Sequence, residues 1–269
     1  MPLLILIPIV VVILIYLFLI APKNNKEMER YKTVMYAHRG LHNDERAENS
    51  MSAFRAAVDG GYGIELDIRL SKDGKLVIFH DDTLDRVCGR EGKVIDFTAD
   101  ELATFSLNGT SDGVPLFSDF LAMVDGRVPL LVEIKEDAGD SAVSHAACEM
   151  LASYKGDYII ESFNPLSLKT VKGLMPEKSR GILSHRYYAY EQYRKPLYFA
   201  LQCLLLNFLC RPAFIAYDHR HASSFALRLC RKLFKVPTLA WTVRSAEDEA
   251  IARKNGFDGI IFENYIPTP

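Results

Sequence analysis

The stretch Gly63–His80, which reads GIELDIRLSKDGKLVIFH, decides the fold predicted for this chain. Its two apolar halves are separated only by Ser71–Lys75. A crossover between parallel strands needs about a dozen residues or more, whereas the dipeptide Asp73-Gly74 is a strong signal for a β-hairpin. We therefore predict two antiparallel strands, Gly63–Leu70 and Leu76–His80.

A two-residue turn at Asp73-Gly74 also predicts which residues face each other. The numbers of paired residues then sum to about 147. Asp67 would lie opposite His80, and Glu65 would lie opposite Asp82. The hairpin is thereby expected to bring an acidic strand beside a histidine.

Outside this hairpin, apolar runs alternate with helical patterns. This alternation is typical of a parallel sheet covered by helices. At this length we expect an α/β fold of the TIM type, a closed (β/α)8 barrel, rather than an open doubly wound sheet. The first βα turn also lacks the GxGxxG of a dinucleotide fold. Because the hairpin adds one strand to a barrel of eight, the expected strands are Val34–Ala37, Gly63–Leu70, Leu76–His80, Leu130–Ile134, Tyr158–Ser162, Arg180–Ser184, Ala213–Tyr217, Thr238–Val243 and Gly259–Phe262. The expected helices are Ser50–Asp59, Ser118–Val124, Ser141–Tyr154, Leu166–Leu174, Ser223–Phe234 and Ala246–Asn255.

Two segments interrupt the alternation and are interpreted as insertions. Residues 82–115 carry turn signals and one short helical pattern near Ala99–Phe105, which indicates an excursion over one end of the barrel. Residues 187–212 contain Leu197–Cys210, an apolar stretch that is too short to span a bilayer. We expect one helix here, buried against the barrel. A helix at a membrane surface or a partner surface is the alternative.

The composition describes an ordinary globular protein. The chain has 269 residues, of which 49% are apolar and 25% charged, with a formal net charge of −2. The absence of a basic run argues against nucleic acid as a partner. The five cysteines form no CxxC pair, which argues against a disulfide framework or a thiolate metal site and favours a reducing compartment. We expect one barrel domain over residues 33–269.

The N-terminal segment predicts attachment to a membrane. Pro2–Ala21 (PLLILIPIVVVILIYLFLIA) carries no charge, and about 20 such residues can cross a hydrocarbon core of roughly 30 Å. We expect a transmembrane anchor over residues 1–21 and a linker over residues 22–32. A cleaved signal peptide is the alternative, although a basic start and a clear small-residue cleavage site are missing. The positive-inside rule predicts a single-pass membrane protein with a cytoplasmic body, because basic residues follow the span and none precedes it: Lys23, Lys26, Arg30 and Lys32.

Three carboxylates on predicted strands indicate a metal site. Glu65 and Asp67 are two residues apart, so both side chains point to one face of the sheet, as do Glu133 and Lys135. Adjacent carboxylates repel each other unless a cation lies between them, and three oxygen ligands suit Ca²⁺ or Mg²⁺ better than zinc. A solvated sheet edge with ordinary ion pairs is the alternative.

Two histidines lie at the ends of predicted strands. His38 and His80 titrate near neutrality, so they can act as general base and general acid at a phosphorus centre. Arg39 suits bidentate contact with a phosphate, and Lys135 can stabilise developing negative charge. Together with the acidic residues, this set indicates metal-assisted attack on a phosphodiester. The remaining histidines are interpreted as structural: His42, His145, His185, His219 and His221.

The order of the motifs AHRG, EN, ELDIRLSKDGKLVIFHDDTLDR, VPLLVEIK, SFNP and WTV resembles the glycerophosphodiester phosphodiesterase family. The resemblance covers about residues 34–265. It implies a phospholipase-C-like barrel that uses a divalent metal to split glycerophosphodiesters into an alcohol and sn-glycerol 3-phosphate. It also implies attack by the neighbouring glycerol hydroxyl, which gives a cyclic phosphate that water then opens.

The same resemblance implies a role for each site residue. His38 and His80 are the acid–base pair, and Glu48 supports the His38 loop. The residues expected to act in catalysis are His38, His80, Arg39 and Lys135; those expected to bind metal are Glu65, Asp67 and Glu133; and those expected to bind substrate are Arg39, Lys135, Glu48 and Trp241.

Three positions depart from the family pattern. Ala47 stands where proline is usual, Arg244 follows Trp-Thr-Val where asparagine is usual, and Phe262-Glu263-Asn264 replaces a Thr-Asp pair. These departures concern the wall that contacts glycerol or the alcohol. Together with the apolar insertion and the anchor, they make lysophospholipase D-like cleavage of membrane lysophospholipids an alternative.

Two other activities are alternatives of a different kind. A phosphoinositide-cleaving lyase would stop at the cyclic phosphate, and only the family resemblance argues against it. An anchored module could bind metal and phosphodiester without turnover. Because binding alone does not need two histidines, intact His38 and His80 favour the enzyme.

Overall fold

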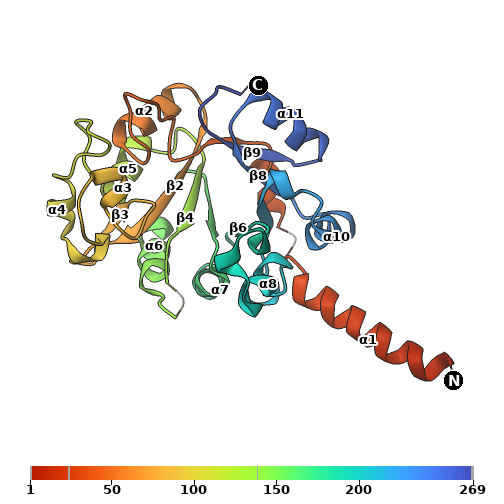
Figure 1. Cartoon of the computed structure of the whole chain (residues 1–269). Coiled ribbons are helices and arrows are strands. Elements are labelled where there is room, and N and C mark those ends of the chain that lie inside the picture. Colours follow the sequence, from red (N-terminus) through yellow and green to blue (C-terminus); the bar gives the residue numbers. More distant parts are fainter. Residues whose placement is uncertain (1, 24, 138, 268–269) are drawn as a thin grey trace.

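The barrel is built from parallel strands, as the sequence predicts. The computed structural model describes residues 2–23, 25–137 and 139–267, with the side chains of residues 2–5 outside this description. Among these residues, a nine-stranded sheet runs in the order β1-β9-β8-β7-β6-β5-β4-β2-β3, and pairing of β1 with β2 closes the ring (Figure 1). The parallel strands are β1 (Met35–Ala37), β2 (Gly63–Leu70), β4 (Leu130–Ile134), β5 (Tyr158–Ser162), β6 (Arg180–Ser184), β7 (Phe214–Asp218), β8 (Thr238–Val243) and β9 (Gly259–Phe262).

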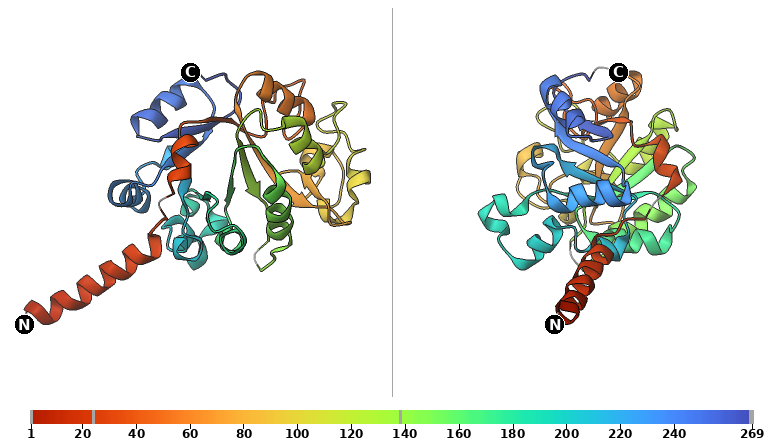
Figure 2. Two further views of the ribbon diagram at one scale, coloured as in Figure 1. Left: turned by 180° about the vertical axis from the view of Figure 1, so that it is seen from behind. Right: turned by 90° about the vertical axis from the view of Figure 1, so that its right-hand side faces the viewer.

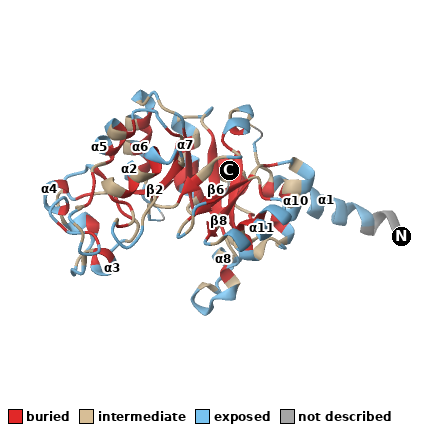
Figure 3. Cartoon of the chain, turned by 90° about the horizontal axis from the view of Figure 1, so that it is seen from above, coloured by how far each residue is buried: buried red, intermediate tan, exposed pale blue. Residues whose placement is uncertain are grey.

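The strands are buried on both faces, which explains their continuous apolar sequences. Side chains such as Leu66 and Val132 point outward into the layer between sheet and helices. Side chains such as Leu131 and Leu239 point inward and fill the barrel. Seen from above, buried strands form the centre and exposed helices the periphery (Figure 3). The TIM-type barrel is therefore confirmed.

The helices surround the barrel in all views (Figure 2). Each expected helix begins and ends within two residues of its predicted bounds. Ser50 caps the first of them by accepting a hydrogen bond from the backbone N–H of Ala53, and Asn164 caps another before Pro165. The bounds are α2 (Met51–Asp59), α5 (Phe117–Val124), α6 (Ala142–Ser153), α7 (Pro165–Leu174), α10 (Phe225–Phe234) and α11 (Ala246–Lys254).

The predicted hairpin is present, but its predicted register is wrong. Strand β3 (Leu76–Ile78) pairs antiparallel with β2, and Ile68 lies opposite Ile78. The backbone N–H of Phe79, not His80, donates to the carbonyl of Asp67 (2.9 Å). The pairing of Glu65 with Asp82 is likewise wrong, because the ladder ends before that position.

The reason lies in the turn, which is longer than predicted. Backbone N–H of Ser71 donates to the carbonyl of Lys75 (3.0 Å), so three residues form the loop. The Ser71 hydroxyl bridges the turn by donating to Asp73, and Gly74 has φ +74°. A loop of three residues in place of two moves the register by one residue.

The insertion over residues 82–115 has a small core of its own. It contains α3 (Asp85–Cys88), a 3₁₀ turn η2 (Val94–Asp96) and α4 (Ala99–Leu102). Buried side chains such as Leu102 and Phe105 pack with Phe79 at the end of the hairpin. The insertion is thereby fixed beside the carboxyl end of β2.

The second insertion does not form the single helix predicted over Leu197–Cys210. It contains η3 (Tyr187–Ala189), η4 (Glu191–Tyr193), α8 (Pro196–Gln202) and α9 (Asn207–Cys210). Leu204 has φ +57° and separates α8 from α9. The break turns Leu204, Asn207 and Cys210 into the core, while Leu197 is 56% exposed. The expectation of a buried helix is therefore correct for the second half only.

The N-terminal segment forms α1 (Pro2–Ile20), which projects from the barrel (Figure 1). Its C-terminal end is held by the guanidinium of Arg211, which donates to the carbonyls of Phe18 and Ala21. In the described part of the chain, no helix combines the length and apolarity needed to cross a membrane, so the predicted span over residues 1–21 is not confirmed. The predicted linker carries η1 (Lys26–Arg30) and packs Met28 into the barrel.

Candidate active site

The His38 loop is held in a tight turn directly after β1. Arg39 has φ +54° and Gly40 has φ +80°. A Cβ atom at Gly40 would lie 2.9 Å from the ring of Phe54, so the turn can approach α2 only with glycine. Backbone N–H of Asn49 donates to the carbonyl of Arg39 (2.9 Å). This contact joins the Glu-Asn motif to the loop.

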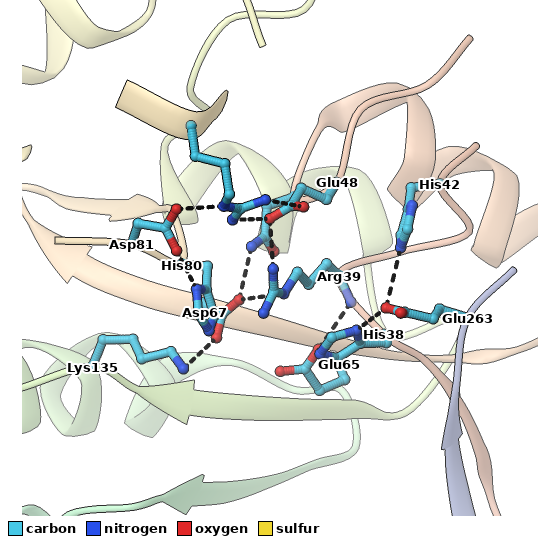
Figure 4. Close-up of polar contacts among 12 residues, drawn as sticks. His38, Arg39, His42, Glu48, Glu65, Asp67, His80, Asp81, Lys135 and Glu263 are labelled. Atoms are coloured by element: carbon cyan, nitrogen blue, oxygen red, sulfur yellow. Dashed lines mark hydrogen bonds and ion pairs between the residues drawn. The ribbon is translucent and has the colours of Figure 1, made fainter. Parts of the chain in front are cut away.

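The three predicted metal ligands lie together inside the barrel. Asp67 pairs with Glu133 in the β2–β4 register, and Glu65 lies two residues earlier on the same face. All three are buried, and they offer oxygen atoms within 4.8 Å of one another. Figure 4 shows Glu65 and Asp67 with their neighbours.

The charges of this acidic group are only partly balanced. Nζ of Lys135 lies 2.7 Å from Glu133 and 3.1 Å from Asp67. Burial acts to raise the pKa of Asp67, but Lys135 and other nearby cations hold it well below its usual range. Burial and neighbouring carboxylates nevertheless raise the pKa of Glu65 well above its usual range and that of Glu133 to about 7.

This imbalance fits a divalent cation. Even with Lys135 in place, two of three buried carboxyls resist ionisation, and a cation of higher charge would relieve their repulsion. The donor set consists only of carboxylate oxygens, which suits Ca²⁺ and Mg²⁺. The residues Glu65, Asp67 and Glu133 therefore fit the predicted metal site.

Each of the two predicted catalytic histidines is held by a carboxylate. Nδ1 of His38 lies 2.5 Å from Glu263, and Nδ1 of His80 lies 2.6 Å from Asp81 (Figure 4). Burial lowers the pKa of both rings, that of His80 to about 4. Nε2 of His38 lies 4.0 Å from Glu65, so this ring faces the acidic group. The carboxylates of Glu263 and Asp81 contact Nδ1, so they leave Nε2 of each ring unengaged by these two residues.

A chain of ion pairs connects Arg39 to the first insertion. Nη1 of Arg39 donates to Glu48 (2.6 Å), and its Nε lies 3.4 Å from Asp67. Arg86, from α3, donates to Glu48 (2.7 Å) and to Asp81 (2.6 Å). Burial acts to raise the pKa of Glu48, but the two guanidiniums lower it to about 2. The predicted support of the His38 loop by Glu48 thus includes a residue of the insertion.

Two departures from the family pattern contact each other. Nε of Arg244 donates to Glu263 (2.6 Å), and Nε2 of His42 lies 3.7 Å from the same carboxylate. Burial acts to raise the pKa of Glu263, but contacts with His38, His42 and Arg244 hold it well below its usual range. His38, His42 and Glu263 also have the geometry of a metal site. Arg244 opposes a cation there, because it already neutralises the carboxylate.

Trp241 lies on β8, in an aromatic wall beside the polar cluster. Its ring is 5.4 Å from Phe163 and 6.0 Å from His185, in edge-to-face contacts. Nζ of Lys135 lies 5.7 Å from the Phe163 ring, which connects this wall to the acidic group. Within the described residues, the indole N–H of Trp241 has no hydrogen-bond partner. His185, interpreted as structural, belongs to the same wall.

The structure thus brings eight of the nine predicted residues into one polar cluster, with Trp241 on the adjoining wall. Sequence reasoning missed several members: Asn49, Asp81, Arg86, Glu161 and Glu263. Asn49, Asp81 and Arg86 stand inside the quoted motifs, and Glu263 stands at a noted departure. Glu161 is a buried carboxyl paired with Glu133 in the β4–β5 register. The sequence signal for Glu161 was a single acidic residue within an otherwise apolar predicted strand.

The sequence is similar to those of glycerophosphodiester phosphodiesterases. A glycerophosphodiester phosphodiesterase of Caldanaerobacter subterraneus is 33% identical over 171 residues, which cover 56% of this chain and 67% of the relative. One of Bacillus altitudinis is 31% identical over 170 residues, which cover 56% and 66%. The aligned parts therefore span about two thirds of these relatives.

Solved structures show the same fold. An Oleispira antarctica phosphodiesterase in complex with the product sn-glycerol-3-phosphate superimposes with a TM-score of 0.72 at 22% identity, covering 87% of this chain and 94% of that one. A glycerophosphodiester phosphodiesterase of Thermotoga maritima gives a TM-score of 0.67 at 25% identity, with coverages of 86% and 94%.

A family model supplies the assignment. The model described as "Glycerophosphoryl diester phosphodiesterase family" matches residues 38–266. That range includes the loop of His38 and Arg39, the barrel strands from β2 onward, both insertions and Glu263. The resemblance drawn from the motifs is confirmed: this chain belongs to the glycerophosphoryl diester phosphodiesterase family.

Proposed function

We propose that this chain hydrolyses glycerophosphodiesters to an alcohol and sn-glycerol 3-phosphate by metal-dependent acid–base catalysis. One observation carries the proposal: His38 and His80, each held by a carboxylate, lie at the buried acidic group of Glu65, Asp67 and Glu133. Paired histidines are suited to act as general base and general acid toward the oxygens of a phosphodiester.

The proposed reaction has two steps. One imidazole takes the proton from the glycerol hydroxyl next to the phosphate, and that oxygen bonds to phosphorus. The bond from phosphorus to the alcohol oxygen breaks, and the other imidazole supplies the proton that the alcohol needs. Water then opens the cyclic phosphate, with the two histidines exchanging roles.

Two cationic side chains, Arg39 and Lys135, would bind the phosphate group. Arg39 lies next to Asp67 and can contact phosphate oxygens with its planar guanidinium. Lys135 adds a positive charge where negative charge develops on phosphorus-bound oxygens. Glu65, Asp67 and Glu133 would hold Ca²⁺ or Mg²⁺. When bound, such an ion contributes Lewis acidity toward the phosphoryl oxygens.

We further propose that α1 attaches the chain to a membrane. The helix carries no charged residue, and apolar side chains along it, such as Val12 and Phe18, are more than half exposed. The ring of Tyr16 stacks on Phe225 of α10 at 6.3 Å, which places α10 beside α1. The basic residues of α10 would then meet lipid phosphates: Arg228, Arg231 and Lys232.

The proposal also specifies the side of the membrane on which the barrel lies. Lys23 and Lys26 follow α1 directly, and cytoplasmic flanks are the ones enriched in lysine and arginine. The barrel would therefore lie in the cytoplasm. Labelling of an introduced cysteine near Lys26 with a membrane-impermeant reagent in intact and opened cells tests this orientation; labelling in intact cells would contradict it.

A product assay tests the catalytic proposal. The purified full chain is incubated with glycerophosphocholine or glycerophosphoethanolamine, with Mg²⁺, Ca²⁺ or a chelator, and products are identified by mass spectrometry. Equal amounts of sn-glycerol 3-phosphate and free alcohol are expected with metal. Accumulation of cyclic phosphate would indicate a lyase, and binding without turnover would indicate a binding module; either result contradicts hydrolysis.

A further inference from the structure

A pocket of about 570 Å³ extends from the catalytic cluster toward the second insertion. His80 and Lys135 line its polar end. Its other end is lined by leucines of α8 and of the segment leading into α9, among them Leu197, Leu201 and Leu206. We call this space the acyl pocket. Its size lies within the range of ordinary small-molecule sites.

The wall of the acyl pocket is a preformed aromatic cluster. The rings of His185 and Tyr187 lie 4.0 Å apart, and those of Tyr193 and Tyr198 lie 4.8 Å apart. Tyr187 is only 5% exposed. Rings that pack against each other lose little conformational freedom when a ligand arrives.

One hydrogen bond attaches this wall to the barrel, and a second lies within the insertion itself. The hydroxyl of Ser184, at the end of β6, donates to the carbonyl of Leu201 (3.2 Å). Backbone N–H of Tyr188 donates to the side chain of Gln202 (3.0 Å). The insertion therefore lies in a fixed position beside the catalytic residues.

The outer rim of the acyl pocket is also apolar. Leu166, at the start of α7, is 40% exposed, and Leu197 of α8 is 56% exposed. Both residues line the same pocket. Such side chains at a pocket mouth let an apolar group enter without crossing a polar barrier.

The insertion connects the pocket to the exposed apolar helix α1. Leu209 of α9 lines the pocket, while the ring of neighbouring Phe208 lies 6.3 Å from Phe18 of α1. The side chain of Asn207 donates to the carbonyl of Ile20 (3.1 Å). One short element thus contacts both the pocket and the segment proposed to meet lipid.

We propose that the acyl pocket binds the single acyl chain of a lysophospholipid. This inference rests on the proposed phosphodiesterase chemistry. A 1-acyl lysophospholipid keeps a free hydroxyl next to its phosphate, so the same two steps apply. That hydroxyl attacks phosphorus, the bond to the head-group alcohol breaks, and water opens the cyclic phosphate. The net reaction converts lysophospholipid and water into acylglycerol phosphate and free alcohol.

A cationic head group is the other chemistry that an aromatic wall could accept. The leucines favour the acyl chain, because they offer a cation no negative charge or π-face. Lys135 at the polar end offers a cation no negative charge. Two acidic residues line the pocket, Glu136 and Asp137. The carboxylate of Glu136 already accepts hydrogen bonds from the backbone N–H and the hydroxyl of Ser144.

A chain-length series tests the inference. The purified full chain is given glycerophosphocholine and hexanoyl-, octanoyl- and decanoyl-lysophosphatidylcholine as monomers, with metal, and choline release is measured. Each methylene that leaves water contributes up to roughly a fourfold gain in binding, so kcat/KM should rise over the series. Turnover of glycerophosphocholine with a flat series would overturn the acyl pocket and leave the proposed function intact.

Matched variants test whether the dependence of kcat/KM on chain length arises in the acyl pocket. Leu197→Glu should lower the ratio of kcat/KM for the decanoyl substrate to that for glycerophosphocholine by about tenfold or more, because a carboxylate meets the chain. Leu174→Glu is the control, since Leu174 lies on α7 at 47% exposure and outside the pocket. An equal ratio in wild type and Leu197→Glu would overturn the assignment.

Binding can be followed without turnover. Trp241 is the single tryptophan of the chain and contacts Phe163 and His185, which line the pocket. A brominated alkylphosphocholine should quench its fluorescence in the wild type and in Leu174→Glu, and less in Leu197→Glu. If choline alone displaced this quencher, the pocket would hold the head group and the inference would be wrong. If no substrate were cleaved but quenching occurred, the proposed function would fail while the pocket assignment stood.

Discussion

The carboxylate of Glu263 lies 2.5 Å from Nδ1 of His38, although the two residues are 225 positions apart in the sequence. The contact joins the loop after β9 to the loop after β1, which are neighbouring strands of the barrel. A second carboxylate, Asp81, holds His80 in the same manner from the next position in the chain. Both histidines therefore have a carboxylate at Nδ1, but the carboxylate at His38 comes from a distant part of the chain and the one at His80 from the adjacent residue.

Glu263→Gln should lower kcat by about 10- to 100-fold, because the ring of His38 loses its charged partner and its fixed orientation. The carboxylate of Glu263 acts to raise the pKa of His38 against the lowering by burial. Its removal should therefore move the His38 inflection of the pH–rate profile to lower pH. Glu247→Gln, on the surface of α11, is the control, and an unchanged profile in Glu263→Gln would contradict the role of this contact.

His80→Ala should reduce turnover by about 10²-fold or more, the usual contribution of a positioned acid or base. The fold should persist, because His80 lies beyond β3 and is partly exposed. Steady-state kinetics and thermal unfolding check both points. His145→Ala, at an exposed position of α6, serves for comparison. Near-normal activity in His80→Ala would disprove its assignment as acid or base.

Chelation should stop turnover, and Mg²⁺ or Ca²⁺ should restore it. An independent readout is thermal stability: metal at about 100 times its Kd stabilises by about 2.7 kcal/mol, which raises Tm by several degrees. Asp67→Asn should abolish this rise in Tm, because the metal site loses one of its three buried carboxylates. Asp119→Asn, exposed on α5, should keep it. Turnover that resists chelation would refute the metal site.

The metal-free chain should become less stable as pH rises from about 4.5 to about 7. Burial and nearby carboxylates raise the pKa of Glu133 to about 7 in the folded chain, above that of an unfolded glutamate. Between these values the folded state binds more protons than the unfolded state, so stability falls with pH, by up to about 3 kcal/mol.

Urea unfolding in the presence of a chelator at pH 5 and pH 7 measures this change. Glu133→Gln should flatten the dependence, while Glu149→Gln, an exposed residue of α6, should leave it as in the wild type. Stability that increased over this range in the wild type, with no change in Glu133→Gln, would show that repulsion in the acidic group is already relieved without metal.

Much of the fold could be predicted from sequence because its signals are local. The strands β2, β4, β5, β6, β8 and β9 have the predicted bounds, since each is a short apolar run between turn residues. Strand period alone placed Glu65 and Asp67 on one face. The motifs and the family resemblance named eight residues that the barrel brings into one cluster.

The break at Leu204 and the partner of His38 depended on tertiary structure, whereas the hairpin register depended on the local conformation of the turn, which strand periodicity does not report. The three-residue loop closed by the backbones of Ser71 and Lys75 places Asp67 opposite Phe79. The chain turns inward at Leu204, and after this turn the side chain of Asn207 donates to the carbonyl of Ile20 at the end of α1. Neither contact is encoded by the periodicity of a single segment.

By itself, therefore, the sequence determined the barrel, the acidic group and the family. Only the tertiary structure decided how the site is supported and what lies beside it. Closure of the barrel brings Glu263 to His38, and packing of the second insertion against β6 and α7 forms the acyl pocket. The physical reason is that hydrophobic periodicity is a property of neighbouring residues, whereas these contacts join segments far apart in the chain, whose positions depend on loop conformation and barrel closure.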